Sequence, residues 1–299
     1  MDTVLLLIAS GLPGAPVIAQ GEIEAVRRPL GLAQPARWLS PGKACEWSLP
    51  LPASDHRRVE DELRQRLGPA PIDVAVIPAA NRRKALLVAD MDSTIIGQEC
   101  IDELAVLAGV GDKISAITER AMRGELAFEE ALEARVAMLK GLASDAITRV
   151  IRERITFTPG GRQLVQTMRA HGARTALVSG GFTAFTAHVA EIVGFDHHHG
   201  NTLVVENEVL TGEVGTPILG RDAKLAALRE LCASAGIALA DALTVGDGAN
   251  DIPMLEAAGL GVAFHAKPKA RDAAAVRIDH GDLTALLYLQ GYTDAEFRS

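Results

Sequence analysis

Short and nearly continuous apolar runs recur along the chain after residue 84. They lie at residues 85–89, 174–178, 242–245 and 261–264, and helix-like segments separate them. A continuous apolar run is typical of a parallel strand that is covered on both faces. The alternation of such strands with helices predicts a doubly wound, Rossmann-like α/β core, in which ligands bind at the carboxyl ends of the strands.

Residues 1–80 predict a smaller α+β domain with its own sheet. Its expected elements are strands at 3–10, 36–39, 44–49 and 72–78 and helices at about 16–26 and 55–67. Ser54 is expected to cap the second helix, and Gly68 to end it. The order β-α-β-β-α-β matches the ferredoxin-like split motif, and in pattern alone it resembles the ACT-like modules, which are regulatory or dimerising. The polar residues 81–84 form the expected linker to a core domain at 85–299.

A helical insertion is predicted directly after the first core strand. Between about residues 98 and 155 no apolar strand pattern occurs, and four stretches read as helices: 101–107, 112–122, 128–140 and 144–153. Helices inserted at this place form a cap over the strand ends, where they can exclude water and choose the substrate. A second, smaller insertion is expected at 202–213, as a β-hairpin that turns at Asn207.

Composition and charge narrow the class of protein. The chain has 299 residues, a net charge of −8 and a pI near 5.5, so no overall positive field attracts nucleic acid. No apolar stretch approaches the ~20 residues of a membrane span, and Asp2 with the short run 4–9 argues against a signal peptide. The widely spaced Cys45, Cys100 and Cys232 are expected to be free thiols that are buried or half-buried. These features predict a cytoplasmic protein that acts on a small molecule.

The strongest chemical signal is the stretch Asp-Met-Asp-Ser-Thr at residues 90–94, directly after the first apolar run. Two carboxylates two residues apart can converge on one site, where one attacks and binds a metal and the other transfers protons. Met91, between them, is expected to point into the core. Taken alone, Asp and Ser at a strand end more simply cap the next helix. Three further motifs in comparable places favour a catalytic site instead.

These three motifs follow other predicted strands. The Ser-Gly-Gly turn at 179–181 offers a hydroxyl and closely approachable backbone N–H groups to a phosphate. The sequence GDGAND at 246–251 presents the Asp247 carboxylate on a tight turn, as a hard cation such as Mg²⁺ requires. Lys224 lies between the two motifs, in a helix that begins near Arg221. A lone lysine is usually solvated, so only its order in the chain makes Lys224 a candidate.

In this order, the four motifs resemble the haloacid dehalogenase-like (HAD) superfamily over about residues 85–290. Within it, the chain resembles the phosphoserine phosphatase family, which hydrolyses O-phospho-L-serine in the last step of serine biosynthesis. The spacing from Asp90 to Glu99 is that of the family's glutamate for the substrate ammonium. Arg135 lies in a stretch like the one whose arginine binds the substrate carboxylate, and Phe128 is expected to pack over the ligand.

The resemblance also implies the catalytic chemistry. Asp90 is the nucleophile that forms a phospho-aspartate, and Asp92 is the general acid and base. The side chains of Asp90 and Asp247 and the backbone carbonyl of Asp92 hold Mg²⁺, while Asp251 lies in the shell behind these ligands. The same oxygen ligands also accept Mn²⁺ or Co²⁺.

For the phosphate, the resemblance implies a separate set of contacts. Ser179, the Gly180 N–H group and Lys224 bind its oxygens, and Lys224 also neutralises the aspartyl phosphate. Asn250 is placed on the substrate side of the site, where it orients water and the nearby loop.

Several alternatives stay open at this point. Glu99 and Arg135 favour an amino-acid substrate but do not set its length, so another HAD phosphatase or phosphotransferase, for example one acting on phosphohomoserine, is the nearest rival. A non-catalytic regulatory ligand-binding protein is a rival of another class. Oligomeric state is undetermined, with a homodimer among the options. The histidines at 197–199 are expected in a solvated loop, because consecutive extended residues alternate faces and cannot easily share one ion.

Overall fold

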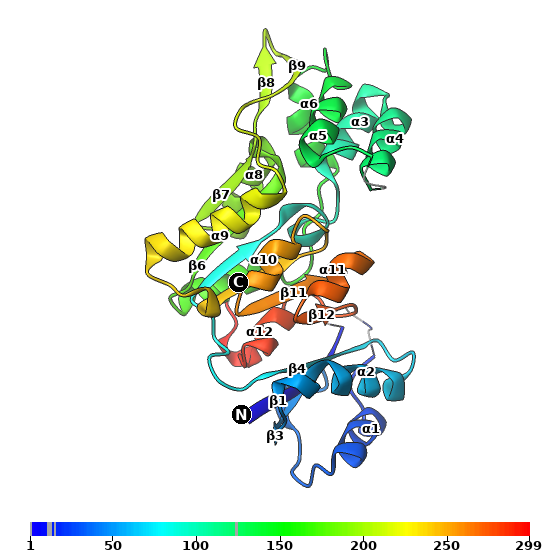
Figure 1. The fold of residues 1–299 in the computed structure, drawn as a ribbon, viewed down its shortest axis with the longest axis vertical. Coiled ribbons are helices and arrows are strands. Elements are labelled where there is room, and N and C mark those ends of the chain that lie inside the picture. The colour runs from blue at the N-terminus through cyan, green and yellow to red at the C-terminus, as the bar shows by residue number, and fades with distance from the viewer. Residues whose placement is uncertain (1, 11–13, 15, 123–124) are drawn as a thin grey trace.

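The computed structural model describes residues 2–10, 14, 16–122 and 125–299. Along the long axis, Figure 1 shows an N-terminal sheet with two helices at one end, a central sheet in the middle, and helices α3–α6 at the other end. Helices cover both faces of the central sheet. The predicted α/β core is therefore confirmed.

All six strands of the central sheet are parallel and lie in the order β12-β11-β10-β5-β6-β7. Their bounds are β5 (Leu86–Ala89), β6 (Arg174–Phe182), β7 (His197–Asn201), β10 (Ala242–Gly246), β11 (Leu260–Phe264) and β12 (Val276–Ile278). The chain first builds from β5 to one edge and then returns to build from β10 to the other edge. Such a reversal between two neighbouring strands leaves a crevice at their carboxyl ends, where ligands bind.

Alternate residues of the core strands enter two separate apolar layers. Leu87 and Leu177 pack with one set of helices: α7 (Gly161–Ala170), α8 (Thr183–Val193) and α12 (Ala285–Leu289). Leu86 and Ala176 pack with the helices of the other face: α9 (Arg221–Ala235) and α10 (Ile252–Ala257), beside which α11 (Pro268–Ala273) lies. Because both faces are covered, these strands are continuously apolar, which is why the sequence predicts four of them.

The two edge strands, β7 and β12, are not continuous apolar runs of this length, so the sequence did not predict them. β12 has only three residues, and β7 begins with three exposed histidines. The predicted solvated loop at 197–199 is therefore wrong in its backbone, since these residues pair with β6. Their side chains are solvent-exposed, as predicted. An edge strand tolerates polar residues because only one of its sides is paired and little of it is covered.

The helices of the cap lie where the sequence predicts them. They are α3 (Cys100–Ala108), α4 (Gly111–Met122), α5 (Phe128–Ala137) and α6 (Asp145–Glu153). The chain enters and leaves this group through two adjacent segments. Their backbones are joined by hydrogen bonds from Gly97 to Thr156 and from Thr158 to Ile95, each 3.0 Å long. The chain thus passes from the core into these helices and back at one paired crossing.

The predicted hairpin is present as β8 (Leu203–Glu206) and β9 (Val209–Val214). It turns at Asn207, which has a φ of 49°. The hairpin packs beside α5, and the backbone N–H of Gly141 donates to the carbonyl of Leu210 at 2.8 Å. The second insertion therefore joins the cap, a contact that its sequence does not reveal.

The N-terminal elements have the predicted order β-α-β-β-α-β. They are β1 (Asp2–Ala9), α1 (Gln20–Leu30), β2 (Arg37–Ser40), β3 (Ala44–Pro50), α2 (His56–Leu67) and β4 (Ile72–Pro78). The four strands form an antiparallel sheet in the order β2-β3-β1-β4.

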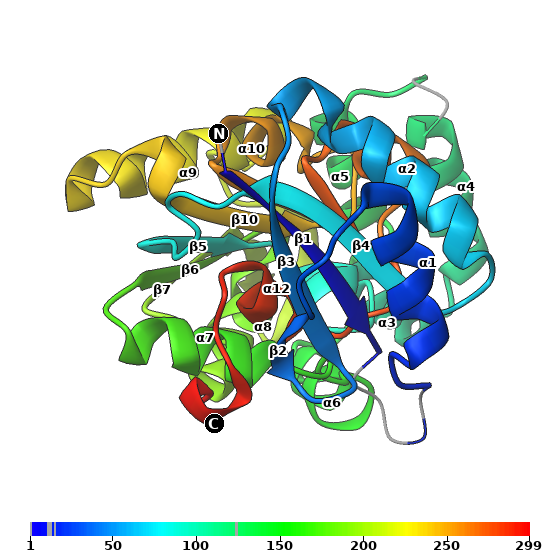
Figure 2. The same cartoon turned by 90° about the horizontal axis from the view of Figure 1, so that it is seen from below.

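Both faces of this N-terminal sheet are covered. Leu5 and Leu7 pack under α1 and α2, whereas Leu6 and Ile8 join the large apolar core that includes Leu286 of α12. Figure 2 shows β1 and β3 running beside α12, and β1 packs against this helix. Because the sheet is buried on both sides, β1 is continuously apolar although its neighbours are antiparallel.

Polar contacts join the N-terminal sheet to the core. The buried Asp73 carboxylate, on β4, accepts backbone N–H groups of Asp279 at 2.8 Å and Gly281 at 2.7 Å. Glu46, on β3, pairs with Arg82 at 2.9 Å. These contacts lie at the end of the core that is remote from the cap (Figure 1).

Two local predictions in the N-terminal part need correction. α1 begins at Gln20 rather than near 16, and it ends at Leu30, where Gly31 adopts a left-handed conformation with a φ of 61°. Ser54 does not cap α2, because a tight turn at 53–55 precedes the helix and no side-chain cap bond forms there. Gly68 ends α2 as predicted, with a φ of 60°.

The three cysteines are free and buried, as the sequence predicts. Burial raises the pKa of Cys45 to about 12 and the pKa of Cys100 further still, so neither is a reactive thiolate. In the described part of the chain, no helix combines the length and apolar character needed to cross a bilayer.

Candidate active site

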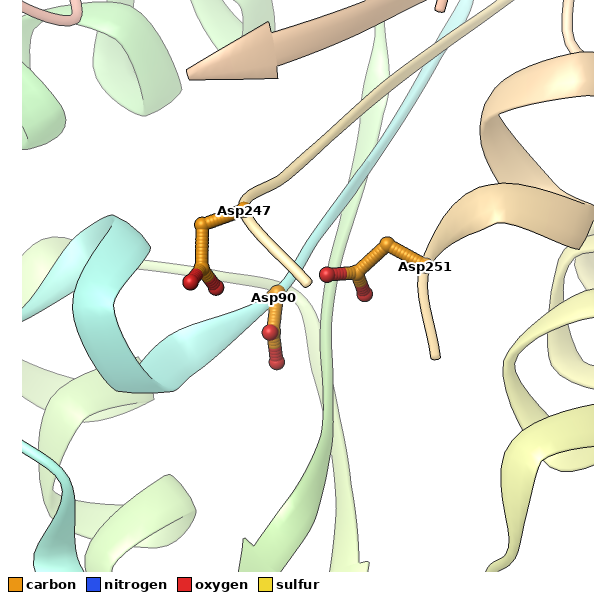
Figure 3. Close-up of side chains that lie close together, drawn as sticks. All are labelled: Asp90, Asp247 and Asp251. Atoms are coloured by element: carbon orange, nitrogen blue, oxygen red, sulfur yellow. The ribbon is translucent and has the colours of Figure 1, made fainter. Parts of the chain in front are cut away.

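The site forms where the strand order reverses, at the carboxyl ends of β5 and β10. Asp90 directly follows β5, and its backbone N–H donates to the carbonyl of Val245 in β10 at 3.0 Å. Asp247 directly follows β10, and Asp251 precedes α10. Figure 3 shows these three carboxylates reaching one another from separate segments of the chain.

Lys224 joins two of these carboxylates. Its Nζ lies 2.7 Å from Asp90 Oδ1 and 2.5 Å from Asp251 Oδ1, and its side chain is only 4% exposed. Asp251 Oδ2 accepts the backbone N–H of Gly248 at 2.9 Å. Although burial alone lowers the pKa of Lys224, the charges of Asp251 and Asp90 raise it above its usual value. Lys224 is therefore a fixed, buried cation.

Asp92 lies two residues after Asp90, in the turn that follows β5. Asp92 Oδ1 accepts the backbone N–H of Cys100 at 3.0 Å, and Oδ2 accepts the hydroxyl of Ser179 at 3.3 Å. The backbone N–H of Gly181 in turn donates to the Ser179 Oγ at 2.8 Å. The Asp-x-Asp and Ser-Gly-Gly motifs, which are far apart in sequence, thus form one hydrogen-bonded group. Met91 is buried in the core, as predicted.

The acidic residues fit a divalent cation. Among the described residues, one group of His, Cys, Asp or Glu side chains brings three ligand atoms within 4.8 Å of one another: Asp90, Asp247 and Asp251. Burial raises the pKa values of Asp90 and Asp247, because the surrounding protein does not fully stabilise their ionised forms. Carboxylate oxygens are the ligands that Mg²⁺ prefers, so the donor set fits the predicted cofactor.

The cap brings its predicted residues to the same crevice. Glu99 Oε1 accepts the hydroxyl of Ser93 at 2.9 Å, so it faces the turn between Asp90 and the cap. The ring of Phe128 lies over Gly180, where an added methyl group would be 3.0 Å from the ring Cζ. Arg135 is half-buried, and burial lowers its pKa while the charges of Asp102, Glu99 and Asp92 oppose the shift.

Asn250 belongs to the loop between β10 and α10. Its side-chain oxygen folds back against Gly248 within its own loop. This position lies beside Asp251 and Asp247, and the role expected for Asn250 on the substrate side stays a prediction.

Sequence reasoning missed Lys267. Its Nζ lies 3.0 Å from Asp247 Oδ2 and 3.8 Å from Glu99 Oε1, and its backbone N–H donates to the carbonyl of Asp247 at 2.9 Å. Lys267 follows β11, so the same search of strand ends that pointed to Asp90 and Asp247 could have found it.

Asp92 has an unusual acidity for a carboxyl group. Burial, and then the negative charge of Glu99, raise the pKa of Asp92 to about 6. A carboxyl group in this range can be protonated when it gives up a proton and ionised when it accepts one near neutral pH. This property suits a residue that acts as acid in one step and as base in the next.

The raised pKa of Asp92 predicts how the free energy of unfolding of the metal-free protein depends on pH. A group whose pKa is raised on folding stabilises the protein below its unfolded pKa, and this contribution is lost as pH rises through about 6. Asp92→Asn is therefore expected to be more stable than the wild type by roughly 1–3 kcal/mol at pH 7.5 in EDTA. The difference should shrink toward pH 4, which urea unfolding at several pH values measures. A variant that is less stable than wild type at pH 7.5 would contradict the assignment.

Comparison with known proteins agrees with this geometry. The model of the haloacid dehalogenase-like hydrolase family matches residues 87–256. The chain belongs to the haloacid dehalogenase-like hydrolases.

Closer relatives are phosphoserine phosphatases. The phosphoserine phosphatase of Archaeoglobus fulgidus is 42% identical over 243 residues, which are 81% of this chain and 70% of that protein. A phospho-aspartyl intermediate analogue of phosphoserine phosphatase is 39% identical, covers 69% of this chain and 98% of its own, and has a TM-score of 0.65. A HAD family hydrolase from Salmonella enterica resembles both parts of the chain, with 30% identity, 97% and 98% coverage and a TM-score of 0.81. These relatives place the chain among the phosphoserine phosphatases of the family.

Proposed function

We propose that this chain hydrolyses O-phospho-L-serine to L-serine and phosphate through a phospho-aspartate on Asp90. The observation that carries the proposal is the convergence of Asp90, Asp92, Lys224 and Asp247 at two strand ends beneath a cap. The phosphoserine phosphatases among its relatives support the same substrate.

The reaction consists of two phosphoryl transfers. In the first, an Asp90 oxygen forms a bond to phosphorus as the bond from phosphorus to the serine oxygen breaks, and Asp92 gives its proton to that oxygen. In the second, a water oxygen attacks the phosphorus of the phospho-aspartate, and Asp92 takes the proton of that water. The bond to Asp90 breaks, phosphate leaves, and both carboxyl groups return to their starting forms.

The remaining groups stabilise the charge on the transferring phosphoryl group. Ser179 Oγ, the Gly180 N–H and Lys224 Nζ bind its oxygens, and Lys224 also offsets the charge of Asp90. The Asp90 and Asp247 side chains and the Asp92 carbonyl would hold Mg²⁺, which would supply the positive charge that a carboxylate needs to approach an anionic ester. Both oxygens of Asp251 already have partners in Lys224 and Gly248, so we assign Asp251 to holding these groups rather than to direct ligation.

The cap residues select the amino-acid part of the substrate. Glu99 takes the substrate ammonium, Arg135 takes its carboxylate, and Phe128 closes over the phosphoryl group at Gly180. Charged hydrogen bonds at both ends of the amino acid distinguish phosphoserine from simple phosphomonoesters.

Release of phosphate from O-phospho-L-serine, measured with Mg²⁺ and with EDTA beside a panel of phosphomonoesters, tests the proposal. Rapid, Mg²⁺-dependent and phosphoserine-selective release is expected. A higher kcat/KM with phosphohomoserine or a sugar phosphate would retain the Asp90 chemistry and refute the substrate. Failure to hydrolyse any phosphomonoester would favour the binding-protein alternative.

Arg135→Met is expected to raise the KM for phosphoserine by about 10–100-fold, because one charged hydrogen bond contributes about 1.5–3 kcal/mol. Hydrolysis of p-nitrophenyl phosphate, which has no amino-acid carboxylate, should change by less than about twofold by the same reasoning. Arg152→Met, an exposed arginine of cap helix α6, is the matched control. Equal losses with both substrates would count against carboxylate binding by Arg135.

For residues 1–80 we propose an ACT-like module that binds serine or forms a homodimer contact. Its support is the four-stranded antiparallel sheet with two helices on one face. Deletion of the module is a poor test, because the other face of the sheet covers apolar residues of the core. Serine binding by calorimetry and molar mass by light scattering should therefore be measured on the whole chain. A monomer without measurable serine binding would refute the proposal.

A further inference from the structure

Asn201 is a fully buried polar residue near the site, and it takes no part in the proposed phosphoryl transfer. It is the last residue of β7, and it is 1% exposed. Its Nδ2 donates to the carbonyl of Gly180 at 2.8 Å and to the carbonyl of Leu219 at 3.3 Å. Its Oδ1 accepts the backbone N–H of Leu219 at 2.7 Å. The amide group is thus tied to two separate backbone segments.

The first of these segments is the phosphate-binding turn. By accepting a hydrogen bond from Asn201, the Gly180 carbonyl fixes the plane of the peptide unit that it shares with Gly181. The N–H of Gly181, in that same peptide unit, donates to Ser179 Oγ at 2.8 Å, and Ser179 donates to Asp92 at 3.3 Å. A continuous line of hydrogen bonds therefore runs from the Asn201 amide to the general acid, and each bond polarises the next.

The second segment leads into the helix that carries Lys224. Leu219 lies just before α9 (Arg221–Ala235), and Lys224 is in the first turns of that helix. Asn201 and Leu219 also stand at the two ends of the hairpin insertion, which packs on the cap. One side chain thus joins the Ser-Gly-Gly turn, the start of α9 and the base of the hairpin.

The surrounding backbone is packed closely enough to make this joint rigid. At Gly200, next to Asn201, an added methyl group would lie 3.1 Å from the Gly181 carbonyl oxygen. Buried backbone groups at such a place need a hydrogen-bond partner, and a side-chain amide supplies two donors and an acceptor in one plane.

We infer that Asn201 is a positioning residue of the phosphatase, which holds the Ser-Gly-Gly turn and the helix of Lys224 at the spacing that the transferring phosphoryl group requires. The inference rests on the proposed function, in which Ser179, Gly180 and Lys224 bind the phosphoryl oxygens. Asn201 does not touch the substrate and acts through these groups.

Two variants test this role. Asn201→Ala removes all three hydrogen bonds, whereas Asn201→Asp keeps the shape and the acceptor for the Leu219 N–H but removes the donation to Gly180. Displacement of reacting groups by about 1 Å lowers kcat by about 100-fold, and this loss is expected for both variants. The Kd for orthovanadate with Mg²⁺, measured by calorimetry, should rise by about tenfold or more, because vanadate occupies the same phosphoryl site.

Gln290→Ala is the matched control. Gln290 is likewise 1% exposed, and its amide accepts the Lys84 N–H and donates to the Leu286 carbonyl, both at 3.0 Å. It lies on the side of the core remote from Asp90, so it should lose stability without losing vanadate affinity. If Asn201→Ala unfolds near room temperature, Asn201→Asp is measured at low temperature, with its circular dichroism matched to the wild type.

Wild-type kcat and vanadate affinity in folded Asn201→Asp would overturn the inference, as would equal losses in the Gln290 control. The outcome is separable from the proposed function. A wild-type protein that binds vanadate but does not hydrolyse phosphoserine would refute the substrate, while vanadate binding and p-nitrophenyl phosphate hydrolysis would still test Asn201.

Discussion

Replacement of Asp90 by Asn is expected to abolish phosphate release while the fold remains intact. Loss of a nucleophile from a covalent mechanism lowers kcat by at least about 10⁴-fold, because the remaining groups can only bind the ester. In the wild type, Asp90 Oδ1 accepts hydrogen bonds from Lys224 Nζ at 2.7 Å and from the Met91 N–H at 2.8 Å. The oxygen of the asparagine amide can still accept both. The free energy of unfolding should therefore change by less than about 2 kcal/mol.

Initial rates and the intact mass of acid-quenched enzyme measure this result. During turnover, wild type should carry one phosphoryl group and Asp90→Asn none. Asp272→Asn, an exposed aspartate in α11, is the control for the substitution itself and should keep wild-type rates. Unchanged turnover by a correctly folded Asp90→Asn protein would refute the nucleophile assignment.

Lys224→Met is expected to impair both stability and catalysis. Two buried carboxylates, Asp90 and Asp251, would lose their shared cation, and breaking a buried ion pair costs about 3–5 kcal/mol. Loss of a donor to the transferring phosphoryl group should lower kcat by about 10²–10³-fold as well. Urea unfolding in EDTA and steady-state kinetics with Mg²⁺ measure the two effects separately.

The stability loss in Lys224→Met should depend on pH in a defined direction. Burial and the charge of Asp251 already raise the pKa of Asp90, and removal of Lys224 takes away the charge that opposes this shift. A group with a raised folded-state pKa destabilises the protein as pH rises, so the deficit should be smaller at pH 5 than at pH 7.5. Lys269→Met, an exposed lysine of α11, should show no such change. An equal deficit at both pH values would show that Asp90 is not the uncompensated group.

The pattern of apolar residues along the chain was sufficient to predict the strands that are buried on both faces. The core strands from β5 to β11, except for the edge strand β7, are continuous apolar runs because helices cover both their faces. β7 and β12 were not predicted, because β7 consists of polar residues and β12 has only three residues. β1 is also a continuous apolar run, because α1 and α2 cover one face of its sheet and the core covers the other. Its sequence could not show which elements cover these two faces.

The candidate site divides in a similar way. Asp90 and Asp247 could be located from sequence because each directly follows an apolar strand, and strand ends of a parallel sheet share one edge. Lys224, Glu99 and Arg135 lie on helices where a charged residue is usually solvated, so only the resemblance to a family singled them out. Lys267 lies shortly after the apolar strand β11, so the strand-end signal was available for it. Asn201 had neither signal, because it ends the polar edge strand β7.

By itself, the sequence determined which residues form the four inner strands of the core sheet, where the helices of the cap are inserted, and which motifs follow those strands. These features depend on local hydrophobic pattern and on residues adjacent in the chain. Only the tertiary structure decided that one lysine bridges two aspartates, that the hairpin joins the cap, and that Asn201 links the Ser-Gly-Gly turn to the start of α9. Such contacts join residues distant in sequence, and their distances are set by packing of the whole chain, which local pattern does not encode.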